Sequence, residues 1–168
     1  MSILGIDPGL GGAAAIIDEK DGSVVCYYSF PTIGNRLDLK ELIDLFSKLK
    51  KEHKPQRAIL EKAHALPNQG VTSMFNFGVT FGHLEMALSA LKIPYELVVP
   101  RVWTAAMHKG LSRSMTAKER SLQLARGLYP DESFTVTERA SKPHTGVVDA
   151  LLIAEYGRVK LRGEQSNK

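Results

Sequence analysis

The chain has 168 residues and a formal net charge of +4 at pH 7. Its hydrophobic share of 43% and charged share of 24% are those of a folded globular protein, so fibrous and disordered classes are excluded. The longest apolar runs are too short to span a bilayer, and no charged-then-apolar leader opens the sequence. We therefore expect no membrane contact and no export signal. A basic chain suits a nucleic-acid partner without requiring one, so the sequence motifs have to show whether the chain binds nucleic acid.

The length fits one domain, and we expect it to occupy residues 1–162 and to leave 163–168 as a frayed tail. Cys26 is the single cysteine, which excludes an intrachain disulfide and a zinc site made of thiols. Because such a chain suits a reducing compartment, we expect an intracellular, cytoplasmic protein.

The first expected strand, residues 2–6, ends in an Asp-Pro-Gly turn that begins at Asp7. Proline removes a ladder donor and glycine permits unusual backbone angles, so the strand stops there and presents the Asp7 carboxylate. Residues 13–18 then return as a second strand. Gly11 and Gly12 keep the connection thin enough for a polyanion to approach its backbone. Such a tripeptide is also typical of an ordinary turn, so a purely structural role stays open here.

A third strand is expected over residues 23–30, antiparallel to the second because a short charged turn ending in glycine joins them. Residues 31–36 are expected to form a loop. A helix then begins at Asp38, with apolar residues at helical spacing. The strand 57–61 repeats the design of the first, because an apolar run again ends in an acid, Glu61.

A long helix is predicted from residue 71 to residue 91. We interpret its Phe75 and Phe77 as core residues. Gly78 and Gly82 share one face in the middle of this helix, and each costs about 1 kcal/mol relative to alanine. Close packing of that face on the sheet or on another subunit explains the two glycines better than contact with DNA.

Residues 94–99 form the fifth expected strand, and a proline then opens a short helix that leads into the basic segment 109–116. A Thr-x-x-Glu capping box at Thr116 predicts a further helix as far as Leu128. The last helix is expected over residues 141–162, with its apolar positions facing inward.

Three acids stand in apolar surroundings: Asp7 and Glu61 at strand ends, and Asp149 in the last helix. Buried carboxylates are costly unless they are paired, hydrogen-bonded or bound to a metal. A helix-start acid or a core acid paired with arginine would explain any one of them. All three together favour a site for a hard cation such as Mg²⁺ or Mn²⁺, and two such ions can hydrolyse a phosphodiester.

The sequence resembles the RuvC-type Holliday junction resolvases, within the RNase H-like nucleases. The resemblance extends over residues 2–158, and its motifs occur in the family's order. The matching segments are Gly5-Ile6-Asp7-Pro8-Gly9, Ile59-Leu60-Glu61, Gln69-Gly70-Val71 with Phe75-x-Phe77-Gly78, Ile93-Pro94-Tyr95-Glu96, Pro100-x-x-Trp103, Leu128-Tyr129-Pro130 and His144-x-Gly146-x-x-Asp149-Ala150-Leu151-Leu152-Ile153-Ala154.

The resemblance implies an α/β fold with a five-stranded mixed sheet flanked by helices. It also implies a homodimeric endonuclease that cuts four-way DNA junctions with Mg²⁺, or Mn²⁺ in its place, and without a small-molecule cofactor. A metal-activated water would attack the phosphodiester and leave a 5′-phosphate. The resemblance assigns Asp7, Glu61 and Asp149 to the metal, and a bacterial or phage source is expected.

The fourth metal position is less defined, because relatives place an acid or a histidine just before the last aspartate, where this chain has His144 and Thr145. On a regular helix Thr145 shares the face of Asp149, whereas His144 points away. Threonine is a poor ligand for a hard metal, so we expect His144 to bind the metal or to position the attacking water. A helix-start histidine without a role in the site is the alternative.

Lys118 resembles a basic residue that the family uses near the scissile phosphate, although a solvated helix lysine has the same pattern. His64 lies where relatives present an aromatic residue to the junction centre. The remaining candidates for contact with DNA are Lys109, Arg113, Arg120 and Lys142.

Two other functions fit the same residues. One is an RNase H-like nuclease that acts on other branched DNA or on RNA. The other is a branched-DNA-binding protein with impaired catalysis, which the threonine beside His144 makes conceivable. A kinase of the actin-like class shares the opening hairpin, but it needs a second such domain for which this chain has no room.

Overall fold

The structure is a computed structural model, and it describes residues 1–62, 70–137 and 139–166. Five strands form its central sheet: Ser2–Asp7 (β1), Ala13–Asp18 (β2), Val24–Ser29 (β3), Arg57–Glu61 (β6) and Tyr95–Val98 (β7). Their order is β3-β2-β1-β6-β7. β2 is antiparallel to both β1 and β3, whereas β6 is parallel to both β1 and β7. The predicted five-stranded mixed sheet is confirmed.

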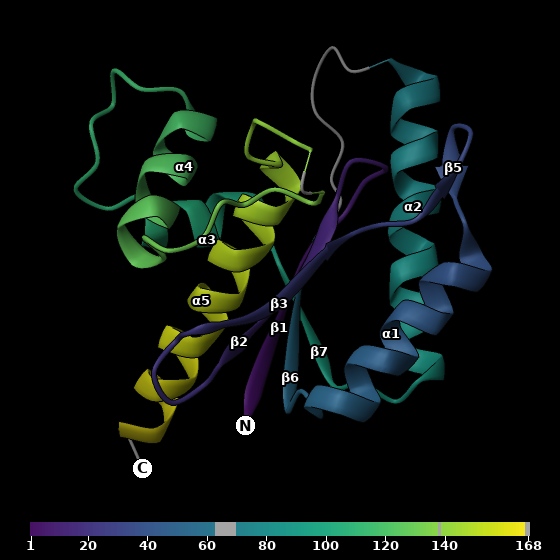
Figure 1. Cartoon of the computed structure of the whole chain (residues 1–168), viewed down its shortest axis with the longest axis horizontal. Coiled ribbons are helices and arrows are strands. Elements are labelled where there is room, and N and C mark those ends of the chain that lie inside the picture. Colours follow the sequence, from purple (N-terminus) through teal and green to yellow (C-terminus); the bar gives the residue numbers. More distant parts are fainter. Residues whose placement is uncertain (63–69, 138, 167–168) are drawn as a thin grey trace.

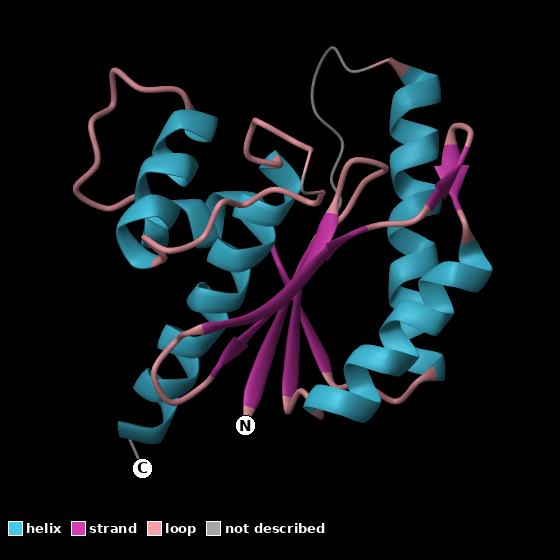
Figure 2. Cartoon of the chain, in the orientation of Figure 1, coloured by secondary structure: helices cyan, strands magenta, loops and turns pink. Residues whose placement is uncertain are grey.

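Helices cover both faces of this sheet, as Figures 1 and 2 show. They span Leu39–His53 (α1), Val71–Ala90 (α2), Pro100–Met107 (α3), Ala117–Leu128 (α4) and Thr145–Ser166 (α5). α1 and α2 lie on one face, and α3, α4 and α5 lie on the other. None of the helices in the described ranges is both long and apolar enough to cross a bilayer.

Alternation along the strands supplies the two hydrophobic cores. In β1, Ile3 belongs to the cluster beneath α5, whereas Leu4 and Ile6 belong to the cluster beneath α1 and α2. Successive strand residues point to opposite faces, so a fully apolar strand serves both layers. This pattern explains why the buried strands read as continuous apolar runs in the sequence.

The predicted helix starts are confirmed at α1 and α4. The Asp38 side chain accepts hydrogen bonds from the backbone N–H groups of Lys40 and Glu41, which have no partner within the helix. At α4, Thr116 and Glu119 form the reciprocal capping box that the sequence predicts.

Two glycines allow α5 to lie directly on the sheet. A Cβ added at Gly5 in β1 would overlap the backbone oxygen of Ala150, and one added at Gly157 would lie 2.5 Å from Cγ1 of Ile59. Main chain therefore meets main chain where α5 crosses β1. The close approach of α5 to the sheet depends on this contact.

The described structure differs from the sequence predictions in several places. Residues 31–36, expected to form a loop, contain most of a small ribbon, Thr32–Ile33 (β4) paired with Arg36–Leu37 (β5). Gly34, at a positive φ of 58°, lies in the turn between these two strands.

α5 begins and ends later than predicted. Its first residue is Thr145, and it continues to Ser166, through most of the tail that was expected to fray. An ion pair anchors this last part, because Glu164 Oε2 lies 3.3 Å from Arg57 Nη1 on β6.

Gly12 has a different role from the one predicted. It is buried, and a Cβ on it would overlap the backbone oxygen of Asp7. The residue closes the turn and does not face a polyanion. Gly11, by contrast, is exposed and has open space where a side chain would be.

Candidate functional site

Two of the predicted acids lie at the same edge of the sheet. Ile6 of β1 pairs in register with Leu60 of the parallel strand β6, so Asp7 and Glu61 are the next residues on the two strands. Parallel neighbours end on the same side, and the carboxyl ends of strands are a common position for sites in such sheets. The two strand ends therefore lie side by side, and a metal shared by their acids stays a prediction.

The start of α5 brings Asp149 to this edge. Its neighbour Ala150 contacts Gly5 in β1, and a Cβ on Gly146 would lie 2.5 Å from the backbone oxygen of Gly11 in the turn after β1. Figure 1 shows the beginning of α5 beside this turn. The third acid therefore comes from a segment far along the chain.

The three acids interact as like charges. Burial raises the pKa of Asp7 well above its ordinary value, and the negative charges of Asp149 and Glu61 raise it further. Burial also raises the pKa of Asp149. The site therefore concentrates negative charge in a place where water cannot screen it well.

Lys118, in the first turn of α4, faces the acids. Its positive charge lowers the pKa of both Asp7 and Asp149, in part offsetting the effect of burial. The side chain is exposed at the rim. A cavity of about 290 Å³ lies beside it, and Lys142, Thr145 and Asp149 are among its lining residues. Lys118 and Lys142 therefore both line the cavity next to the acids.

The donor chemistry of the site fits a hard divalent cation. Three carboxylates offer oxygen ligands, and a bound cation would relieve the repulsion that they exert on one another. In the part of the chain that the structure describes, no group of three or more His, Cys, Asp and Glu side chains is already drawn together as a metal site.

His144 is the residue that precedes α5. Its Nδ1 accepts a hydrogen bond from the backbone N–H of Val147 at 3.3 Å, in the manner of a helix cap. Burial lowers the pKa of its imidazole, so the ring is neutral at pH 7. When Nδ1 accepts, the single ring proton is on Nε2, which is then a donor. This geometry suits the positioning of a water better than the ligation of a metal.

The other predicted DNA contacts have different surroundings. Lys109 and Arg113 are exposed on the connection between α3 and α4. Arg120 is half-buried, and within the described ranges its buried Nε has no hydrogen-bond partner. His64 lies outside the described residues.

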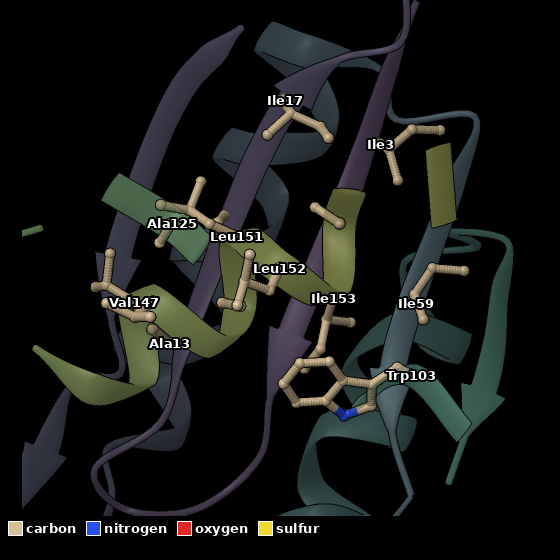
Figure 3. Close-up of a cluster of buried hydrophobic side chains, with 14 of the residues drawn as sticks. Ile3, Ala13, Ile17, Ile59, Trp103, Ala125, Val147, Leu151, Leu152 and Ile153 are labelled. Atoms are coloured by element: carbon tan, nitrogen blue, oxygen red, sulfur yellow. The ribbon is translucent and has the colours of Figure 1, made fainter. Parts of the chain in front are cut away.

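Sequence reasoning missed a second group of residues behind the acids. Trp103 on α3 is only 3% exposed, and its Nε1–H donates to Oε2 of Glu61 at 2.5 Å. Figure 3 shows the indole among the core side chains, close to Ile59 and Ile153. The signal was available, because a buried tryptophan needs an acceptor for its N–H.

The exposed side of α2 corrects another prediction. Phe75 is 70% exposed and does not belong to the core, and Phe77 is half-buried. A Cβ added at Gly78 or Gly82 would meet no atom within 4 Å, so neither glycine packs on the sheet. α2 is apolar on more than one side, and α1 and the sheet cover only one of them.

Comparisons with solved structures agree with this architecture. RuvC of Thermus thermophilus in complex with a Holliday junction substrate matches at a TM-score of 0.67 and 18% identity, covering 97% of this chain and 96% of that one. The yeast mitochondrial Holliday junction resolvase Ydc2 matches at 0.63 and 16% identity, with 98% and 81% covered.

The Fowlpox virus resolvase, solved with its substrate Holliday junction DNA, matches at a TM-score of 0.52 and 16% identity, covering 96% of this chain and 99% of that one. No protein-family model and no curated protein sequence matches the chain. The three matches cover 96–98% of this chain. The chain therefore has the RNase H-like fold of RuvC-type Holliday junction resolvases.

Proposed function

We propose that this protein is a divalent-metal-dependent endonuclease that resolves four-way DNA junctions. The observation that carries the proposal is that the negative charges of Glu61, from β6, and Asp149, from α5, both act on Asp7 at the end of β1. The fold supports it, because proteins of this fold have been solved with Holliday junction substrates. Such an enzyme works in the compartment that holds DNA, in keeping with an intracellular, bacterial or phage setting.

The three acids would hold Mg²⁺, or Mn²⁺ in its place. Ions so held activate a water and stabilise the leaving oxygen in phosphodiester hydrolysis. Asp7 and Glu61 approach from the strand ends, and Asp149 closes the site from α5. Removing any one of the three acids would leave the ion with two carboxylate ligands.

The residues around the acids supply the remaining tasks. Lys118 faces both Asp7 and Asp149 and binds the scissile phosphate as a point charge. His144, with Nδ1 occupied by the helix start, donates from Nε2 to the attacking water. In-line attack by that water gives a 5′-phosphate without a covalent intermediate.

The path of the DNA follows the basic side chains near this edge. Lys142 lines the same cavity as Lys118 and extends the positive rim. Arg120 is half-buried and its Nε is shielded from solvent, so its contact with a phosphate remains a sequence-based prediction. Lys109 and Arg113 are exposed on the neighbouring connection, and His64 remains a sequence-based prediction for the junction centre.

A homodimer is proposed because two coordinated cuts in a four-way junction need two sites related by a two-fold axis. The exposed apolar side of α2 supports it: Val71 is 84% exposed, Phe75 70% and Met86 68%. Gly78 and Gly82 have open space on the same helix, so a second copy can approach its backbone closely.

The test is a cleavage assay on an end-labelled synthetic four-way junction, with a fork, a linear duplex and an RNA–DNA hybrid beside it. Paired cuts in the junction with Mg²⁺, and none in EDTA, are expected. Preferential cleavage of the fork or the hybrid would instead favour the broader RNase H-like nuclease.

Asp7→Asn separates catalysis from binding in this assay, with Asp44→Asn on the exposed face of α1 as the matched control. We expect Asp7→Asn to bind the junction and not to cut it, while the control cuts normally. Binding by the wild type without any cleavage at any metal concentration would favour the branched-DNA-binding protein.

A further inference from the structure

Glu61 is held from behind by the indole of Trp103. The indole Nε1–H donates to Oε2 of Glu61, with donor and acceptor 2.5 Å apart. The bond occupies Oε2 and fixes the direction of the carboxylate plane. A side chain with three rotatable bonds is thereby restricted before any cation arrives.

Trp103 is itself fixed by its surroundings. It lies in the first turns of α3, which begins after the N-cap residue Val99, and its ring packs in the core under α5. The His108 ring meets it edge to face, with centroids 5.9 Å apart and an interplanar angle of 71°. The indole therefore cannot turn away from Glu61 without disturbing the core.

Asp149 is held in a similar way from α4. Ser121 is only 4% exposed and lines the same cavity as Asp149, where its hydroxyl lowers the pKa of the Asp149 carboxyl. The same hydroxyl oxygen lies 3.1 Å from Nε2 of His108. Burial and the nearby Arg120 charge lower the pKa of His108, so its ring is neutral at pH 7. Nε2–H can then donate to the serine, and the serine to the acid.

We infer that Trp103 and Ser121 are positioning residues for the proposed metal site, joined to each other through His108. The inference rests on the proposed function in taking Glu61 and Asp149 as the ligands. The two acids come from β6 and α5, but α3 and α4 hold both of them through one buried group of side chains. Second-layer partners of this kind orient ligands, and their loss typically lowers metal affinity or activity roughly 10- to 100-fold.

The chain offers a direct reporter, because Trp103 is its single tryptophan. Indole fluorescence of the intact protein is followed while Mg²⁺ or Mn²⁺ is added without DNA. A saturable change in the emission is expected, and Glu61→Gln removes it. The single indole N–H signal in a ¹⁵N-labelled sample is a second readout, expected to shift on metal addition in the wild type and not in Glu61→Gln.

Substitutions then test the positioning itself. Ser121→Ala is expected to weaken metal binding roughly 10- to 100-fold, and Ser121→Thr, which keeps the hydroxyl, restores it. Ser47→Ala on α1 is the matched control and leaves metal binding unchanged. Trp103→Phe keeps the ring and removes the donor, so the concentration of Mg²⁺ needed for half-maximal cleavage rises while junction affinity does not change.

The inference would be overturned by indole fluorescence and an indole N–H signal that do not change when metal is added. A Ser121→Ala protein with wild-type metal affinity would also overturn it. If the protein binds metal with the expected indole response but cuts no junction, the positioning role stands and the proposed function is wrong. If both variants cut the junction with an unchanged Mg²⁺ requirement, the proposed function stands and the positioning role is wrong.

Discussion

Replacing Asp7 with asparagine should stabilise the protein in the absence of metal. The pKa of Asp7 is raised by burial and by the charges of Asp149 and Glu61, with only Lys118 opposing them. The folded protein therefore retains this proton at pH values where the unfolded chain has lost it. Stability falls as the pH rises from the ordinary pKa of an aspartate through the raised one, and the full penalty applies above the raised pKa.

The size of the effect follows from removing one such charge. Single stabilising substitutions, including those that improve the charge distribution, commonly contribute roughly 0.5–2 kcal/mol. About 1 kcal/mol moves the melting temperature of a chain of this length by roughly 2–4 °C. We therefore expect Asp7→Asn to melt about 1–8 °C above the wild type at pH 7 in EDTA. The difference should vanish in acid, where the wild-type carboxyl is protonated.

Adding Mg²⁺ should reverse the order. A ligand present at 100 times its Kd stabilises the folded state by about 2.7 kcal/mol, which exceeds the gain from the substitution. The wild type then melts above the variant, provided the variant has lost most of its metal affinity. Calorimetric melts of both proteins, with EDTA and with saturating Mg²⁺, measure all four values.

The reasoning would be refuted by a variant that melts below the wild type in EDTA. That result would mean that the Asp7 carboxylate stabilises the fold through a partner, as an ordinary turn or core acid does. The exposed substitution Asp44→Asn should change the melting temperature little in either condition, and it controls for a general effect of lost charge.

Four further predictions concern other parts of the molecule. Gly5→Ala forces a Cβ into the backbone of α5 and should cost at least the roughly 1–3 kcal/mol of an overpacked core in urea unfolding; Gly163→Ala, in open space on the same helix, should not destabilise. Phe75→Ser should shift sedimentation toward the monomer without lowering the monomer's stability, and an unchanged dimer would exclude the α2 side as its interface. Lys118→Ala should reduce the salt dependence of junction binding by about one contact, seen as a shallower slope in a titration at rising salt. His144→Asn keeps a good helix cap and so should retain the melting temperature while cleavage falls; full activity would remove the imidazole from the reaction.

The sequence predicts the sheet and the acids because their signals are local. An apolar run that ends in a carboxylate appears twice, at Asp7 and Glu61, and the register of β1 with β6 turns that repetition into proximity. The caps at Asp38 and Thr116 are likewise fixed by side chains within three residues of the helix start. Local patterns of this kind survive folding because no distant element competes with them.

Other features depend on distant elements and are not predictable in this way. The exposure of Phe75 depends on which side of α2 the sheet covers. Because α2 is apolar on more than one side, its sequence does not indicate which side that is. The contact between Trp103 and Glu61 joins residues 42 positions apart, and the sequence around either residue does not indicate the other as its partner. The start of α5 at Thr145 depends on His144, whose backbone N–H donates to Phe134 O at 2.8 Å in another segment.

The seating of α5 on β1 through Gly5 has a consequence for redesign. Because main chain touches main chain there, the spacing between Asp149 and the strand acids does not depend on how bulky the surrounding core is. An engineer can exchange apolar side chains elsewhere and keep the spacing of the three acids. Widening the proposed metal site for a larger ion such as Ca²⁺ would call for replacing that glycine rather than the acids.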